Sequence, residues 1–205
     1  MKNEIRVKTW EDCEHEIQQI EQANTGSRGV WFRGHAKASY NLVPSLFRFP
    51  QGVEKEQALF NEYERSAAYL IGEKKNDWET LNDMQHYGLP TRLLDWTEVL
   101  GNAIAFALYD SGDDSFDSAI YLLDPLALNA LSGLKEVKRA PSDSEFGYKA
   151  VYWHGRPFYP NFPIAIDGTL HNSRLRAQNG SFTVQGRVAD ALEMQAESVV
   201  RKVIL

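Results

Sequence analysis

The first candidate for chemistry is the run Trp31-Phe32-Arg33-Gly34-His35. It places an arginine at the exit of a short apolar strand, predicted over Gly29–Gly34. The glycine would allow a ligand close to the backbone, and the planar guanidinium suits a phosphate or a carboxylate. The alternative is that Arg33 pairs with an acidic residue inside the protein, which would make its role structural.

A second run, Met84 to Thr97, is dense in polar groups that are costly to bury, and it lies between two apolar stretches predicted to be helices. Buried polar groups must be paired, so this run either builds a hydrogen-bonded scaffold or faces a ligand. The residues concerned are Gln85, His86, Tyr87, Thr91, Arg92, Asp95 and Trp96.

Within this run, His86 and Tyr87 are the better ligand candidates, because one can donate or accept a proton and the other can stack. Arg92 and Asp95 are three residues apart, and we predict that they form a structural ion pair, with ligand contact as the alternative. Asp95 followed by Glu98 also resembles a capping box at a helix start.

A third run, Asn172 to Thr183, places two arginines and Gln178 before a glycine turn and a short strand. A solvated loop would account for the arginines. It accounts less readily for Gln178 beside Gly180 and Phe182.

Other kinds of site are disfavoured by composition and motif. The 205 residues carry a net charge of -6, which argues against a strongly basic nucleic-acid binder. No phosphate-binding P-loop, Rossmann fingerprint, HExxH metal motif or GxSxG elbow is present. The single Cys13 excludes an intramolecular disulfide and a cysteine-rich zinc site, and we expect no metal. With no apolar signal sequence and no stretch of about 20 apolar residues, we expect a cytoplasmic protein without membrane contact.

The elements that must position these residues predict an α+β fold with a mixed or antiparallel sheet, because early helices precede a strand-rich second half. Apolar spacing predicts helices over Thr9–Ala23, Val53–Gly72, Asp77–Tyr87 and from Asp95 or Thr97 to Tyr109. The last of these is apolar on nearly all sides over Val99–Leu108, so we expect it to be buried. Further strands are predicted over Ser118–Leu123, Tyr148–His154, Phe162–Ile166, Ser181–Gln185 and Ser198–Leu205.

Taken together, these runs resemble the FRG domain, a family of bacterial and phage-associated proteins named after a Phe-Arg-Gly motif, here Phe32-Arg33-Gly34. The second family motif is similar to Gln85–Thr97, and a late motif is similar to Ala177-Gln178 followed by Gly180 and Phe182-Thr183. The resemblance covers roughly Val30 to Leu205. We expect one FRG domain over residues 1–205, with residues 1–28 as an N-terminal helix and loop.

The strand with Arg33 also resembles the first strand of arginine-type ADP-ribosyltransferases, and the fold is expected to be similar to theirs. That resemblance implies NAD as substrate, Arg33 as its anchor, and His86 or Tyr87 as the stacking or orienting group. It implies a late polar residue, Gln178 or Glu197, that stabilises the cation formed when the nicotinamide bond breaks. We expect the ligand also to contact Gly34, His35, Gln85 and Thr91, and we expect Arg33, His86, Tyr87 and Gln178 to converge on one pocket.

Three functions follow as hypotheses. The first is an NAD-dependent ADP-ribosyltransferase-like enzyme that modifies nucleic acid or protein, in phage defence or as a toxin. The second is a non-catalytic module that binds a nucleotide, nucleic acid or peptide in the same pocket. The third, a purely structural role for the motifs, is disfavoured by the polar density between Gln85 and Asp95.

Overall fold

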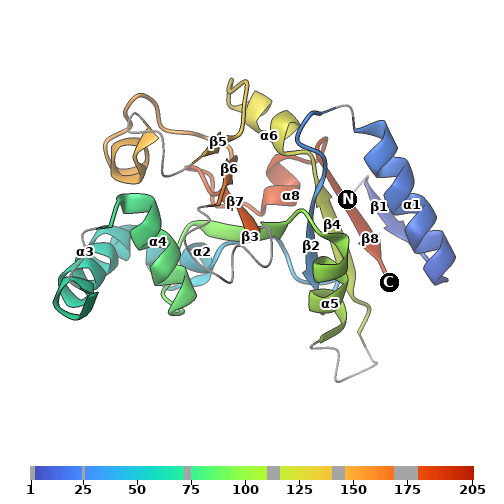
Figure 1. The fold of residues 1–205 in the computed structure, drawn as a ribbon, viewed down its shortest axis with the longest axis horizontal. Coiled ribbons are helices and arrows are strands. Elements are labelled where there is room, and N and C mark those ends of the chain that lie inside the picture. The colour runs from blue at the N-terminus through green and yellow to red at the C-terminus, as the bar shows by residue number, and fades with distance from the viewer. Residues whose placement is uncertain (1–2, 25, 72–74, 110–115, 140–145, 169–179) are drawn as a thin grey trace.

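Eight strands form one mixed sheet in the order β1-β8-β4-β2-β3-β7-β6-β5 in the described part of this computed structural model (Figure 1). The structure describes residues 1–205 except 1–2, 25, 72–74, 110–115, 140–145 and 169–179. The outer pairs β1–β8 and β5–β6 are parallel, and the inner pairs are antiparallel. The strands are β1 (Glu4–Arg6), β2 (Trp31–His35), β3 (Leu93–Thr97), β4 (Ala119–Leu123), β5 (Lys138–Arg139), β6 (Ile164–Asp167), β7 (Gly180–Val184) and β8 (Val200–Ile204).

Helices cover both faces of the sheet, and three clusters of buried side chains join them to it. The helices are α1 (Trp10–Ala23), α2 (Ser45–Arg48), α3 (Gly52–Ile71), α4 (Asp77–His86), α5 (Leu100–Tyr109), α6 (Pro125–Leu131), the π-helix η3 (Lys149–Trp153) and α8 (Leu192–Gln195). One face packs on α1 and α5 at β2, β4 and β8, and on α3, α4 and η3 at β3, β6 and β7. The opposite face packs on α6 and α8. Figure 1 accordingly shows α3 and α4 at one end of the molecule and α1 at the other.

Local sequence signals predicted α1, α3 and α4 well, whereas the short α2 was not predicted. Thr9 caps α1 in a capping box with Asp12, and Asn76 caps α4 in the same way with Glu79. The α+β prediction is confirmed, and the observed β2, β4, β6, β7 and β8 lie at the predicted strands to within a few residues. None of the helices in the described ranges is long and apolar enough to cross a membrane.

The strand β3 was missed, and the predicted helix start at Asp95 or Thr97 is wrong. Leu93–Thr97 pairs along its whole length with β7, and α5 begins only at Leu100. The proposed capping box of Asp95 and Glu98 is therefore absent, and the Thr97 hydroxyl accepts from the Val99 backbone N–H at the turn. Tertiary pairing with β7 overrides the local helix signal here.

The predicted burial of α5 on all sides is also wrong. Its fully buried residues are Ala103 and Ala107, which lie four apart on one stripe. Three large side chains on the rest of the helix are exposed, namely Phe106 (49%), Leu108 (53%) and Tyr109 (92%). The helix packs so closely on β2 that a Cβ on Gly34 would lie 1.9 Å from the Ala103 carbonyl oxygen. Gly34 thus lets α5 pack closely on β2, and it is also a lining residue of the pocket described below, so its predicted contact with a ligand stays a prediction.

The strand predicted over Tyr148–His154 is a helix instead. Lys149–Trp153 forms η3, with Val151 and Tyr152 buried. Its aromatic side chains pack with Phe60 and Trp78 of α3 and α4, whereas a strand would need a free sheet edge. Aromatic residues are common in strands, which is why the sequence pattern misled.

Candidate functional site

A pocket of about 800 Å³ opens beside β2, within the usual range for ligand sites. Arg33 and His35 of β2 lie on its wall, with Tyr40 from the following segment. Helix α2 adds Arg48, and α5 adds Phe106 and Tyr109. No aspartate or glutamate lies among its lining residues in the described part of the chain.

The pocket lies where two neighbouring strands part. β2 and β3 are paired only at Phe32 and Thr97, although β3 continues in register with β7. Next to that point, Arg33 Nη1 donates to the backbone carbonyl oxygen of Asp95 at 2.7 Å. The Arg33 side chain therefore takes the place of further backbone hydrogen bonds between β2 and β3. The separation of the two strands leaves an opening at the His35 end of β2.

His35 fixes the orientation of Arg33. Arg33 Nε donates to His35 Nε2 at 2.9 Å, so this ring nitrogen must be the acceptor. The proton then lies on Nδ1, which donates to the Tyr40 carbonyl oxygen at 3.2 Å. Burial, and next the positive charge of Arg33, lower the pKa of His35 to about 4. His35 is thus a neutral acceptor near pH 7.

The remaining donors of Arg33 are open to a ligand. Burial lowers the pKa of Arg33, as does Arg48, while Asp95 raises it, and an arginine remains charged under these conditions. Nothing in the described ranges accepts a hydrogen bond from Nη2. Arg48 is exposed and has no carboxylate partner among the residues that the structure describes. Two arginines line this pocket, and the nearest carboxylate, Asp95, lies 3.9 Å from Arg33 without being a lining residue. Such a lining can attract an anionic group.

The pocket rim carries exposed aromatic rings. Tyr40 is 53% exposed, and Phe106 and Tyr109 contribute the exposed side of α5. An aromatic ring that is open to solvent beside a cationic wall can stack on a flat ligand group. The lining therefore suits a ligand with an anionic part and a planar ring.

The second motif reaches this pocket through a chain of hydrogen bonds. The Thr91 hydroxyl donates to Gln85 Oε1 at 2.8 Å, and Gln85 Nε2 donates to Asp95 Oδ1 at 2.7 Å. Asp95 Oδ2 lies 3.9 Å from Arg33 Nη1. Gln85 and Thr91, predicted to bind the ligand, thus hold Asp95, and they are not among the lining residues.

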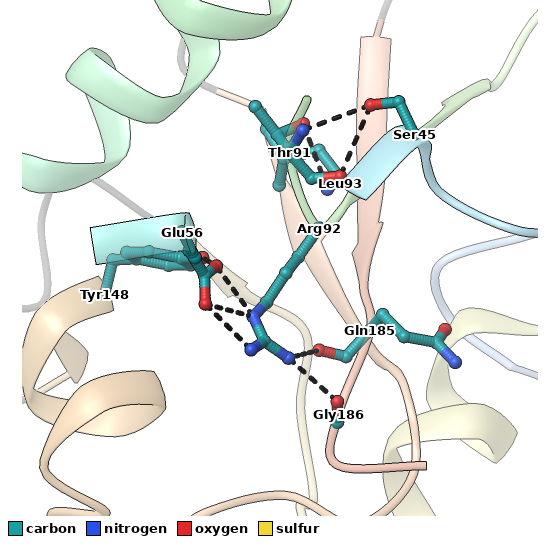
Figure 2. Close-up of polar contacts among 8 residues, drawn as sticks. All are labelled: Ser45, Glu56, Thr91, Arg92, Leu93, Tyr148, Gln185 and Gly186. Carbon is teal, nitrogen blue, oxygen red and sulfur yellow. Dashed lines mark hydrogen bonds and ion pairs between the residues drawn. The ribbon is translucent and has the colours of Figure 1, made fainter. Parts of the chain in front are cut away.

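Arg92 lies in a separate, fully buried network (Figure 2). Its Nε and Nη2 donate to the Glu56 carboxylate at 2.8–3.0 Å, and its Nη1 donates to the carbonyl oxygens of Gln185 and Gly186. The Tyr148 hydroxyl donates to Glu56 Oε1. Burial alone would lower the pKa of Arg92, but the hydrogen bonds and charge of Glu56 raise it overall.

The predicted ion pair between Arg92 and Asp95 is therefore wrong. Asp95 lies on β3 and Arg92 immediately before it, and residues three apart along an extended chain point to opposite sides. Arg92 turns to Glu56 of α3, and Asp95 turns to Gln85 of α4. Arg92 has the structural role that we predicted, with a different partner.

His86 and Tyr87 lie at the end of α4, and they do not line the Arg33 pocket. Both are exposed, Tyr87 by 66%, and the Tyr87 ring contacts those of Tyr63 and His86. The structure thus does not bring these two side chains into the pocket with Arg33. Gln178, the fourth member of the predicted group, lies outside the described residues.

Glu197, the other candidate for the late polar residue, is exposed just before β8. The register pairs Trp31 with Leu123, and Leu123 with Val200, so Glu197 lies beyond the Trp31 end of β2. The pocket lies at the His35 end. The structure therefore does not bring Glu197 to Arg33.

Sequence reasoning missed Arg48, Tyr40, Phe106 and Tyr109 as lining residues and Glu56 as the partner of Arg92. Glu56 belongs to the polar face of a predicted helix, where a solvated carboxylate is the ordinary expectation. Phe106 belongs to Val99–Leu108, which we predict to be buried, and Tyr109 follows it at the predicted helix end. The one available signal was the large number of apolar residues in this helix. A helix with so many large apolar side chains can leave some of them uncovered.

Comparison with known families gives one match. The family model of the FRG domain matches residues 28–115, which include the Phe32-Arg33-Gly34 and Gln85–Thr97 motifs. The late motif lies outside the matched range. No curated protein and no solved structure matches the chain. The two matched motifs are those that the Arg33–Asp95 contact joins in space, and the chain carries an FRG domain at residues 28–115.

Proposed function

We propose that the Arg33 pocket binds a nucleotide, with NAD as the candidate ligand. The observation that carries this proposal is that Arg33 and Arg48 both line the pocket, whereas no carboxylate is among its described lining residues. The chain has a net charge of -6, so a local excess of positive charge is not a consequence of composition. Arginine pairs that are open on one side suit the oxygens of a pyrophosphate.

The aromatic rim supports a nucleotide over a simple anion. A phosphate or sulfate ion would use the two arginines and leave Tyr40, Phe106 and Tyr109 unused. A nucleotide base or nicotinamide ring can stack on an exposed aromatic side chain. The cavity volume of about 800 Å³ leaves room for a ligand of that size.

We propose glycosyl transfer from NAD, as in ADP-ribosyltransferases, as the activity, with nucleic acid or protein as the acceptor. The support is the strand arginine Arg33, which is held by His35 and lines the pocket. A non-catalytic nucleotide-binding module is the second candidate. The position of Glu197 at the other end of β2 favours it, because the acid expected to assist bond cleavage is not at the pocket.

Calorimetric titration with NAD tests the binding proposal. Arg33→Met should weaken NAD binding about tenfold to a hundredfold, since a charge-assisted hydrogen bond contributes about 1.5–3 kcal/mol. Arg48→Met should weaken it less, because Arg48 is exposed. Arg65→Met is the matched control, because Arg65 lies on α3 and pairs with Glu62.

Nicotinamide release, measured with DNA, RNA and protein acceptors present, separates the two candidates. Binding with release that depends on Arg33 supports the enzyme. Binding without release supports the recognition module. Failure of the unmodified protein to bind NAD or any other nucleotide contradicts both.

A further inference from the structure

We propose that the Asp95 carboxylate, which lies beside the lining of the Arg33 pocket, determines ligand specificity and faces the positively charged nicotinamide end of NAD⁺. This inference rests on the proposed function, in which Arg33 and Arg48 hold the pyrophosphate. It assigns a ligand contact to a residue that we had expected to be structural.

The first observation is the exposure of Asp95. The other four residues of β3 are buried, yet the Asp95 side chain is 58% exposed. β3 lies inside the sheet, between β2 and β7, where side chains are normally covered. Asp95 is not a lining residue of the pocket, but its Oδ2 lies 3.9 Å from Nη1 of Arg33, which is one. The exposed carboxylate therefore lies next to the pocket, where β2 and β3 part.

The second observation is that the exposed carboxylate is held in one orientation. Gln85 Nε2 donates to Oδ1, and the hydroxyl of Thr91, a residue only 1% exposed, donates to Gln85 Oε1. The Thr91 contact fixes which end of the Gln85 amide faces Asp95. A solvated surface carboxylate needs no such support, whereas a ligand-binding group gains from being held in place before the ligand arrives.

The third observation is that Asp95 is a poor counterion for Arg33. Asp95 Oδ2 is 3.9 Å from Arg33 Nη1, too far for a hydrogen bond. Two neutral acceptors, His35 Nε2 and the Asp95 carbonyl oxygen, already orient the guanidinium. Among the described residues, nothing donates a hydrogen bond to Oδ2.

A carboxylate beside an anion site has a consequence for the ligand. It repels a simple phosphate, so it lowers the affinity for a purely anionic ligand. A ligand that carries both a pyrophosphate and a cation would place the first at Arg33 and the second at Asp95. NAD⁺ has this charge pattern, because its nicotinamide ring is positive, whereas the reduced ring of NADH is neutral.

The test compares three probes by calorimetry at low salt: NAD⁺, NADH, and ADP-ribose, which lacks the nicotinamide. They are titrated into the unmodified protein, Asp95→Asn and the control Asp12→Asn, which makes the same change on the exposed side of α1. Asparagine at position 95 keeps an oxygen that can accept from Gln85, so the variant should fold. Its circular dichroism spectrum and thermal unfolding, compared with those of the unmodified protein, report this directly.

We expect the unmodified protein and Asp12→Asn to bind NAD⁺ about three- to fivefold more tightly than NADH, as for a partly exposed ion pair. Asp95→Asn should lose this preference and bind ADP-ribose at least as tightly as before. A preference that survives in Asp95→Asn overturns the inference, as does the absence of a preference in the unmodified protein. If Asp95→Asn weakens the binding of ADP-ribose as much as that of NAD⁺, the inference is overturned too. The Asp95 contact would then be to the ribose or to Arg33, and not to the nicotinamide. No NAD⁺ binding by the unmodified protein instead contradicts the proposed function itself.

Discussion

Arg33 and Arg92 show two opposite uses of the same side chain within one domain. Arg92 is 2% exposed, and its Nε, Nη1 and Nη2 all donate to acceptors of the protein, chiefly the Glu56 carboxylate (Figure 2). Arg33 is a quarter exposed, and it is oriented by neutral acceptors that leave Nη2 open. A closed set of partners stabilises a fold, whereas an open one retains charge for a ligand.

The two arginines also differ in what surrounds them. Phe47, Tyr152 and Tyr159 lie within about 6 Å of the Arg92 guanidinium and fill the space around it. The aromatic rings near Arg33 line a pocket and face solvent. The same residue types thus build a core in one region and a binding surface in the other, and the difference lies in whether a helix or loop covers them.

The largest expected effect comes from opening the Arg92 network. Arg92→Met would leave the Glu56 carboxylate buried without its partner, which costs about 3–5 kcal/mol of the free energy of unfolding. Urea denaturation followed by circular dichroism measures this. Arg65→Met, an exposed arginine of α3, should unfold like the unmodified protein. Equal stability of Arg92→Met would remove the structural half of the comparison.

A medium effect is expected when the pH is lowered, because acid protonates His35, which holds Arg33. The pKa of His35 is about 4 in the folded protein, below the unfolded value of about 6.5, so the unfolded chain binds more protons between these values. The stabilisation by neutral His35 is therefore complete above about pH 6.5 and is lost as the pH falls toward 4. Between pH 7 and pH 5 this linkage amounts to about 2 kcal/mol.

The variant His35→Gln isolates that contribution, because its amide can still accept from Arg33 Nε and does not titrate. Denaturation curves at pH 7 and pH 5 should show a smaller loss of stability in His35→Gln than in the unmodified protein. The carboxylates titrate in both proteins and cancel in the difference. Identical losses would mean that His35 is not held neutral.

The smallest expected effect on stability is that of Arg33→Met. Its hydrogen bonds go to neutral acceptors and its side chain is partly solvated, so we expect a loss of about 1 kcal/mol. Set against the loss for Arg92→Met, this measures how far the two arginines differ in role. Destabilisation of Arg33→Met as large as that of Arg92→Met would place both residues in the scaffold, and the case for a pocket arginine would weaken.

Much of the fold was readable from local sequence, and part of the site was too. The helices α1 and α4 follow from caps and apolar spacing, which act over three or four residues. Arg33 was recognised from the apolar strand that precedes it, and Asp95 and Gln85 from the density of polar groups. The partner of Asp95 could not be read in this way, because the choice between Arg92, Gln85 and Arg33 depends on which side of β3 each one lies.

The sequence by itself determined the α+β class, the early helices, most of the strands and the two motifs of the FRG domain. Only the tertiary structure decided that Leu93–Thr97 is a strand, that Arg92 pairs with Glu56, and that Arg48 joins Arg33 in one pocket. The physical reason is the range of the interactions. Caps and periodicity act between near neighbours, whereas strand pairing and buried ion pairs join residues far apart, where many partners of the same type compete.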